Sequence, residues 1–312
     1  MIKRIEHSKK RKTNWFKSRL YTRSDGVFLV FSFIVLLAVL LIIAYPLYYV
    51  ILGSFDPRLQ ARSGIPLLPA QVTFEGYIAA MQDRSLWRGY MNSIVYTTVG
   101  TLINLFVTIC AAYPLSRKDF VGRKIFMTLF VFTMYFSGGL IPSYLLVVNL
   151  GMMDTMWALV LPGAIAVINI IIMRTYFQSS IPHEMLEAAQ MDGCSNIRFL
   201  IKIVLPLSQP IIAVMVLFFS VGHWNSFFSA LLYIRSADML PLQMVLRRIL
   251  ILNQFDPEAM MNMSPEAVAL LMQRSDVMRY VVIILASVPV MILYPLVQRY
   301  FVKGVMIGSI KE

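Results

Sequence analysis

Long apolar stretches that contain no acidic residue recur along this chain and indicate its architecture. A helix needs about 20 apolar residues to cross the hydrocarbon core of a bilayer. Six stretches are long enough and lack Asp and Glu: residues 27–52, 92–115, 125–147, 156–178, 204–232 and 279–300. The pattern therefore predicts an all-α polytopic membrane protein with six transmembrane helices.

The composition supports a membrane location, and the basic residues predict an orientation. Hydrophobic residues make up 58% of the chain and charged residues only 14%, whereas a soluble domain carries about 25% charged residues. Of the 28 Lys and Arg residues, 19 lie in the two termini and in the segments 116–124 and 174–203. Basic residues concentrate on the cytoplasmic side of membrane proteins, so we expect both termini to be cytoplasmic. Two termini on one side require an even number of crossings.

The same pattern predicts four parts of the chain. They are a basic cytoplasmic tail (1–26), a first span with an outer loop (27–88), a transmembrane domain (89–300) with a cytoplasmic loop at 179–203, and a cytoplasmic C-terminal tail (301–312). Within the last outer segment, Ser264-Pro265-Glu266 predicts the start of a short amphipathic helix. The aromatic residues lie inside the apolar stretches and not among the basic ones, so we expect no binding of nucleic acid.

One polar interruption, EAAQMDGCSNIRFLIKIVLP at residues 187–206, differs from an ordinary loop. Pro182 suits the first turn of a helix, Gly193 a left-handed cap at its end, and Ser195 the cap of a second short helix. The pattern predicts a cytoplasmic helix-turn-helix hairpin that is too short and too polar to be a span.

The residues alone leave two interpretations of this hairpin open. Ala188 and Ala189 would allow another surface to approach closely, and Glu187 beside them could bind a partner's Lys or Arg. The hairpin would then dock into a groove on a cytoplasmic protein. Alternatively, the alanines only favour a helix, and Asp192-Gly193 is only a turn.

The chemistry of an enzyme or of an ion-coupled pump is missing. The sequence has no GxxxxGK[ST] phosphate-binding motif and no HExxH zinc motif, and its 3 histidines are scattered. We therefore predict no catalytic site, no metal site and no cofactor on this chain. Ion-coupled transporters usually keep acidic residues inside their spans, which this chain lacks. The energy for any transport must then come from another chain.

The hairpin resembles the EAA loop of ABC importer membrane subunits, in which Glu-Ala-Ala is followed by Gly, Ile and Leu-Pro at fixed spacing. The matching residues are Glu187, Ala188, Ala189, Asp192, Gly193, Ile203, Leu205 and Pro206. Stretches on both sides of the hairpin are also similar to maltose-type sugar permeases: 92–117, 139–162, 223–234, 241–248 and the C-terminal tail. The similarity is greatest to the MalG-like half of such permease pairs, of the LplC/YtcP type.

This resemblance implies the type I ABC importer (MetI-like) permease fold and a division of labour among chains. The expected partners are a second permease subunit of the MalF/LplB-like type, a dimer of ABC ATPases that holds ATP and Mg²⁺, an extracellular solute-binding protein, and the lipid of a bacterial cytoplasmic membrane. The EAA helix would fit a cleft of the ATPase and transmit its closure to the spans. The expected substrate is a carbohydrate, and within that class an oligosaccharide.

A sugar path needs aromatic rings beside amide groups. The candidates inside or near the spans are Trp224, Asn225, Asn169, Tyr135 and Asn104. For each, a contact between neighbouring helices is the competing role, and the residues alone favour that role. Two other protein classes stay open at this point: a secondary transporter of a small polar solute, and an assembly scaffold.

Overall fold

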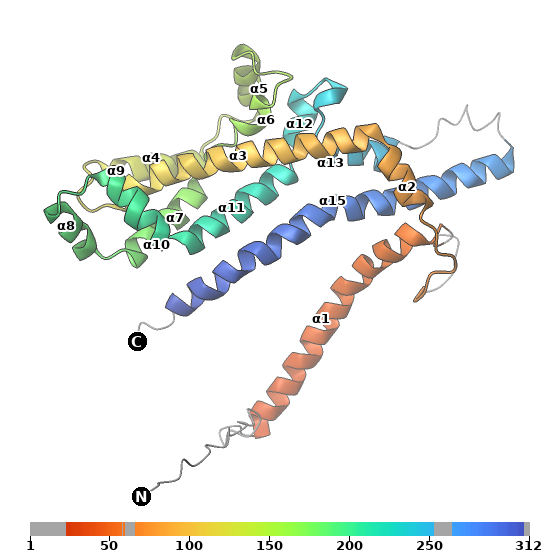
Figure 1. Cartoon of the computed structure of the whole chain (residues 1–312), viewed down its shortest axis with the longest axis horizontal. Coiled ribbons are helices and arrows are strands. Elements are labelled where there is room, and N and C mark those ends of the chain that lie inside the picture. Colours follow the sequence, from red (N-terminus) through yellow and green to blue (C-terminus); the bar gives the residue numbers. More distant parts are fainter. Residues whose placement is uncertain (1–22, 58, 60–65, 253–263, 309–312) are drawn as a thin grey trace, which may run out of the picture. The chain divides into compact units, whose positions relative to one another are not determined.

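The computed structural model describes residues 23–57, 59, 66–252 and 264–308, and every regular element among them is a helix (Figure 1). The prediction of an all-α protein is therefore confirmed for these residues. Residues 1–22 of the predicted basic tail, the outer segment 253–263 and residues 309–312 lie outside the described part. The chain divides into two compact units, Met1–Val50 and Ile51–Glu312.

Three continuous helical segments are long and apolar enough to cross a membrane: Asp25–Phe55, Arg84–Ser116 and Ser275–Gln298. The first belongs to α1 (Arg23–Phe55), the second is α3 (Arg84–Ser116), and the third is part of α15 (Pro265–Gly308). Two bent pairs of helices raise the number of candidate spans to 5 if each pair counts as one. The chain is thus an all-helical polytopic membrane protein with 3 to 5 candidate spans in its described part.

The predicted span 125–147 is one of the bent pairs. It consists of α4 (Arg123–Tyr135) and α5 (Leu140–Asn149), which meet at an angle of 109°. At the junction, Gly139 has φ +84°, a conformation that residues with a side chain rarely adopt. Helix α4 ends at Tyr135, and Gly138-Gly139 stand between it and α5; glycine is unfavourable inside a helix by about 1 kcal/mol.

The prediction of one continuous helix over 156–178 is wrong. The segment forms α6 (Trp157–Val160) and α7 (Val167–Ser180), separated by a non-helical stretch. Pro162 and Gly163 lie in this break. Proline lacks a backbone N–H, and glycine is a poor helix former. The apolar pattern did not predict the break, because the residues around Pro162 are themselves apolar.

The predicted span 204–232 is also divided. It contains α10 (Leu205–Leu207), α11 (Gln209–Trp224) and α12 (Phe228–Tyr233). The helical segment that ends at Leu207 meets α11 at 82°. Pro206 and Pro210 flank this bend, and neither can donate a backbone hydrogen bond. The first residues of the predicted span therefore belong to the hairpin.

The predicted helix start at Pro265 is confirmed, because α15 begins there and the Val268 N–H donates to the Ser264 carbonyl at 3.0 Å. The expected separation of a short amphipathic helix from the last span is wrong, since all 44 residues form one helix. Polar residues at 274–279 interrupt the apolar pattern, but none of them is Gly or Pro, so the helix continues through them.

Helices α3, α7 and α11 share one apolar core. Small residues allow α3 and α11 to approach closely. A Cβ added to Gly100 of α3 would collide with the ring of His223 of α11. Close by, the buried hydroxyls of Thr101 and Ser220 lie 3.1 Å apart. The shared core also places the C-terminal end of α3 beside the hairpin that precedes α11.

Four further described helices lie in the segments predicted to be extracellular. They are α2 (Glu75–Gln82), the 3-10 helix η3 (Ala237–Met239), α13 (Leu242–Arg247) and the π-helix η4 (Arg248–Leu252). The N-terminal half of α3 binds η3 and α13. The Ser93 hydroxyl accepts from the Leu242 N–H at 2.8 Å, and the Tyr96 hydroxyl donates to the Met239 carbonyl at 3.0 Å.

Asp154 joins two loops that the sequence predicted to be extracellular. Its φ of +57° is in the left-handed region, and its carboxylate accepts from the backbone N–H groups of Arg235 and Ser236, each at 2.9 Å. It also accepts from the Ser236 hydroxyl. These hydrogen bonds, led by those from Ser236, lower the pKa of Asp154. The segment before α6 is thereby held against the segment after α12.

Candidate functional site

The polar stretch between α7 and α11 forms the predicted hairpin, and its first arm is α8 (His183–Met191). Gly193 follows this helix with φ +70°. The Gly193 N–H donates to the carbonyl of Gln190 at 3.0 Å. The Cys194 N–H donates to the carbonyl of Ala189 at 2.9 Å. Together the two bonds are the Schellman motif that ends many helices, so the predicted left-handed cap at Gly193 is confirmed.

The second arm begins where the sequence placed its cap. The Ser195 hydroxyl accepts from the Arg198 N–H at 3.4 Å, at the start of α9 (Asn196–Phe199). The helix then widens into the π-helical turn η2 (Leu200–Val204) before α10. The predicted cap is confirmed, whereas the second helix is not regular through Lys202. Single π-helical turns are rare and are often found at functional sites.

The two alanines of the motif have different surroundings. Leu186 and Ala189 are buried in the core shared with α7 and α11, while Ala188 is exposed. Residues three apart share a helix face, which explains why Ala189 follows Leu186 inward. The expectation that both alanines face a partner is therefore wrong for Ala189. Ala188 alone of the pair is open to another surface.

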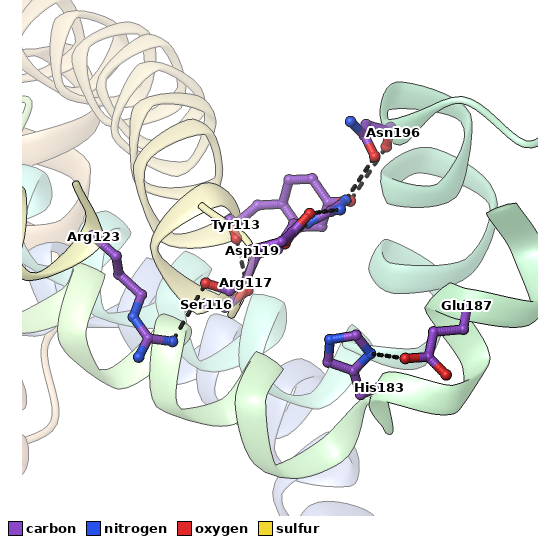
Figure 2. Close-up of polar contacts among 8 residues, drawn as sticks. All are labelled: Tyr113, Ser116, Arg117, Asp119, Arg123, His183, Glu187 and Asn196. Atoms are coloured by element: carbon purple, nitrogen blue, oxygen red, sulfur yellow. Dashed lines mark hydrogen bonds and ion pairs between the residues drawn. The ribbon is translucent and has the colours of Figure 1, made fainter. Parts of the chain in front are cut away.

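Several apolar side chains of the hairpin are exposed. Met191, Ile197 and Ile201 are 89%, 72% and 57% exposed. Glu187 is exposed beside them, and its Oε1 lies 3.2 Å from Nδ1 of His183 (Figure 2). An exposed apolar patch with a polar rim is typical of a surface that binds another protein.

The other motif residues connect this surface to the spans. Asp192 is the exposed C-terminal cap of α8. Ile203 is half-buried against the core of α3, α7 and α11. Leu205 and Pro206 start α10, the short helix before the bend into α11. The motif thus includes both the surface of the hairpin and its attachment to α11.

A set of contacts that the sequence did not predict joins the hairpin to α3. Arg117, directly after α3, donates from Nε and Nη2 to Asp119 at 2.8 and 2.5 Å. Its Nη1 donates to Oδ1 of Asn196 in α9 at 2.7 Å (Figure 2). The hydrogen bonds from Arg117 lower the pKa of Asp119. We call Arg117, Asp119 and Asn196 the latch.

The sequence contains a signal for the latch, because the opposite charges of Arg117 and Asp119 stand two positions apart. The basic residues of this segment predict only the topology.

Other side chains cap the same end of α3. Arg174 Nε donates to the Leu115 carbonyl at 2.9 Å, and Gln178 donates to the Ser116 carbonyl at 3.1 Å. The last carbonyls of a helix lack partners within it, so these bonds stabilise the end of α3.

Two of the predicted sugar-path residues donate hydrogen bonds to carbonyls of other segments of the chain. Trp224 is buried, its Nε1 donates to the Ala286 carbonyl at 3.0 Å, and its ring meets that of Tyr90 edge-on at 5.5 Å. Asn104 donates from Nδ2 to the Gly163 carbonyl at 3.3 Å. Trp224 also lines a cavity of about 380 Å³ between α3, α11 and α15.

The other three candidates do not join them in one cluster. Tyr135 is 79% exposed at the end of α4, and Asn169 is buried in α7. Asn225 caps α11, and its Oδ1 accepts from Gln243 at 3.4 Å. The structure thus places the five residues on several faces of the helices.

Comparison with known proteins defines the family. No family model matches the chain. It is 40% identical over 294 residues to protein LplC of Bacillus subtilis, with 93% of this chain and 97% of the relative covered. It is 37% identical to the polygalacturonan/rhamnogalacturonan transport system permease protein YtcP of the same species, covering 91% and 97%. The arabinooligosaccharides transport system permease protein AraQ of Halalkalibacterium halodurans is 30% identical, covering 97% and 99%.

A solved structure agrees with these relatives. One chain of a bacterial ABC transporter involved in the import of the acidic polysaccharide alginate matches with a TM-score of 0.80 and 31% identity, covering 91% of this chain and 100% of that one. The helical fold and the hairpin define a membrane transport subunit. The chain belongs to the family of ABC transporter permease proteins.

Membership in this family confirms the resemblance that the hairpin indicated. Permease subunits of ABC transporters carry no ATPase site, so the chain is a transport component and not an enzyme. The alternatives of a secondary transporter and of a scaffold are set aside. The chain is a multi-pass protein of the cytoplasmic membrane and part of an ABC transporter complex.

Proposed function

We propose that this chain is one of two permease subunits in an oligosaccharide importer of a bacterial cytoplasmic membrane. A second permease subunit completes the pore, an ATPase dimer with bound ATP and Mg²⁺ drives it, and an extracellular solute-binding protein delivers the sugar. Support for the substrate class comes from relatives named for arabinooligosaccharides and polygalacturonan. The proposal depends above all on the hairpin, which exposes apolar surface while its inner side is fixed in the core.

The proposed topology has six crossings and both termini in the cytoplasm. Helix α7, with 14 residues, forms the central part of the fourth crossing together with the short α6. An even number of crossings is supported by the basic residues, which concentrate in the segments assigned to the cytoplasm. The proposed parts of the chain remain the tail 1–26, the first span and outer loop 27–88, the transmembrane domain 89–300 and the tail 301–312.

In this proposal the ATPase grips the exposed side of α8 through Glu187, Ala188 and Met191. ATP binding closes the ATPase dimer and shifts α8. The shift passes to α7 and α11 through the buried Leu186 and Ala189, and to α3 through the latch. The spans then change from an inward-facing to an outward-facing arrangement. This is a change between two states that is driven by ATP bound to another chain.

The proposed sugar path divides into two kinds of residue. Trp224 and Asn104 are bonded within the chain and would shape the path by positioning helices. Tyr135 is exposed and Asn225 lies at the end of α11, so both could present polar or aromatic groups to a sugar. Asn169 would act from the inner face of α7.

The docking role of α8 can be tested by adding bulk to its exposed face. Ala188→Trp should leave the fold intact, because Ala188 is exposed, but should keep a partner at a distance. We expect loss of ATPase co-purification and of ATP-driven oligosaccharide uptake at normal membrane abundance. Ala237→Trp, at an exposed alanine of the outer segment, is the matched control and should keep the ATPase attached. Normal ATPase attachment and uptake in Ala188→Trp would refute docking through this face.

A further inference from the structure

A cavity of about 510 Å³ lies between the ends of α3 and α7 and the hairpin. Its lining includes the cationic side chains of Arg117, Lys118, Arg123 and Arg174, with His183 at its rim. None of the residues that line it is acidic. The cavity therefore concentrates positive charge in a partly enclosed space.

The charges of this cavity are only partly compensated within the described residues. Arg117 pairs with Asp119 in the latch. Arg123 and Arg174 instead donate to backbone carbonyls, those of Arg117 at 3.3 Å and Leu115 at 2.9 Å. A carbonyl accepts a hydrogen bond but does not neutralise a guanidinium. Cations that are partly removed from water are stabilised by an anion, and this site lacks one among the side chains that line it.

Two further features match a phosphate group. Guanidinium groups bind phosphate oxygens through two parallel N–H donors, and Arg123 and Arg174 supply such groups; Tyr113 and Gln178 also line the cavity but already donate to the carbonyls of Asn196 and Ser116. The N-terminal end of α8, at Pro182 and His183, borders the same space. The N-terminus of a helix carries partial positive charge and unpaired N–H groups, so it favours an anion.

We propose that this cavity binds a phosphate-bearing anion. In the proposed topology helix α3 ends its crossing near Ser116, which would place the cavity at the level where phospholipid headgroups meet the cytoplasm. An anionic lipid headgroup and a free phosphate share the required chemistry. Either would bridge the end of α3 to the start of α8 and stiffen the hairpin against the spans.

The test measures binding to the assembled transporter and does not depend on transport. The complex is placed in phosphatidylcholine nanodiscs, and binding of a fluorescent phosphatidylglycerol is titrated; inorganic phosphate is titrated separately on the complex in lipid-free detergent. The variants are Arg174→Gln and Lys118→Gln, since Lys118 is exposed and its replacement should spare the fold. Lys124→Gln is the matched control, because Lys124 is exposed, adjacent to Arg123 and not part of the lining.

Loss of one charge-assisted contact should weaken binding roughly ten-fold in both variants and leave Lys124→Gln unchanged. A lipid ligand is identified if phosphatidylglycerol responds and phosphate does not; a free anion is identified if phosphate responds. Equal affinities in all three variants, for both probes, would overturn the proposal. Loss of ATPase attachment in Arg174→Gln with unchanged affinity for both probes would also overturn it, and would assign the cations to the ATPase. Either of these outcomes would refute anion binding in the cavity and would leave the proposed docking of α8 to the ATPase unaffected.

Discussion

At the scale of single residues, Gly193 controls how α8 ends. Its φ of +70° is a conformation that L-residues rarely adopt, and a Cβ placed there would meet no atom within 4 Å. The cost of a side chain is therefore one of backbone conformation alone, about 1–2 kcal/mol. The same residue sets the angle between the two arms of the hairpin.

Gly193→Ala should lower thermal stability modestly and reduce uptake more strongly, because the hairpin must change its path to relieve the strain. Gly151→Ala is the matched control: Gly151 has φ +66°, also has open space around it, and lies on the outer side. It should lose similar stability but keep coupling between ATP hydrolysis and uptake. Gly193→Asn should recover part of the uptake, since Asn tolerates the left-handed region. Normal uptake by Gly193→Ala would contradict this role of the cap.

At the scale of secondary-structure elements, the latch is the polar connection between α3 and the hairpin. Arg117 binds Asn196 at 2.7 Å while two hydrogen bonds to Asp119 fix its guanidinium. Apolar packing also holds both arms of the hairpin against the core shared with α3, through Leu186 of α8 and Phe199 of α9. The latch adds a polar contact through which motion of the hairpin should reach α3.

Arg117→Ala and Asn196→Ala should each raise the number of ATP molecules hydrolysed per sugar imported, and the double variant should be no worse than Arg117→Ala. Residues in direct contact show such non-additive effects, typically of about 0.5–3 kcal/mol. The measurement is a double-mutant cycle on the ratio of hydrolysis to uptake in proteoliposomes. Arg198→Ala removes an exposed cation from the same helix and should leave the ratio unchanged. Additive effects of the two latch substitutions would show that they act independently.

At the scale of the whole molecule, the topology requires that the hairpin and the outer loops lie on opposite sides of the membrane. Single cysteines at Val72 and Ala237 should react with an impermeant thiol reagent in intact cells, and those at Val121 and Met191 should react only after permeabilisation. All four positions are exposed, so lack of reaction reports the side and not burial. The background replaces the free Cys110 and Cys194 with Ser. Labelling of Met191→Cys in intact cells would overturn the proposed orientation.

Much of the candidate site could be predicted from local sequence, because caps and turns depend on a few neighbouring residues. Gly193 predicted the end of α8, Ser195 predicted the start of α9, and Pro265 predicted the start of α15. The latch could not be predicted in this way. Arg117 and Asn196 are 79 positions apart, and only the packing of α3 against α7 and α11 brings them together.

The sequence by itself determined that this is a helical membrane chain with a polar hairpin that resembles a docking loop, and it predicted an orientation for the chain. These properties depend on composition, on charge placement and on short spacings, which act locally. Only the tertiary structure decided where the apolar stretches break, which of Ala188 and Ala189 faces outward, and how cations distant in sequence enclose one cavity. Hydropathy measures whether a segment can enter lipid. It does not predict where the backbone bends or which face of a helix is buried, because both depend on the neighbours against which the segment packs.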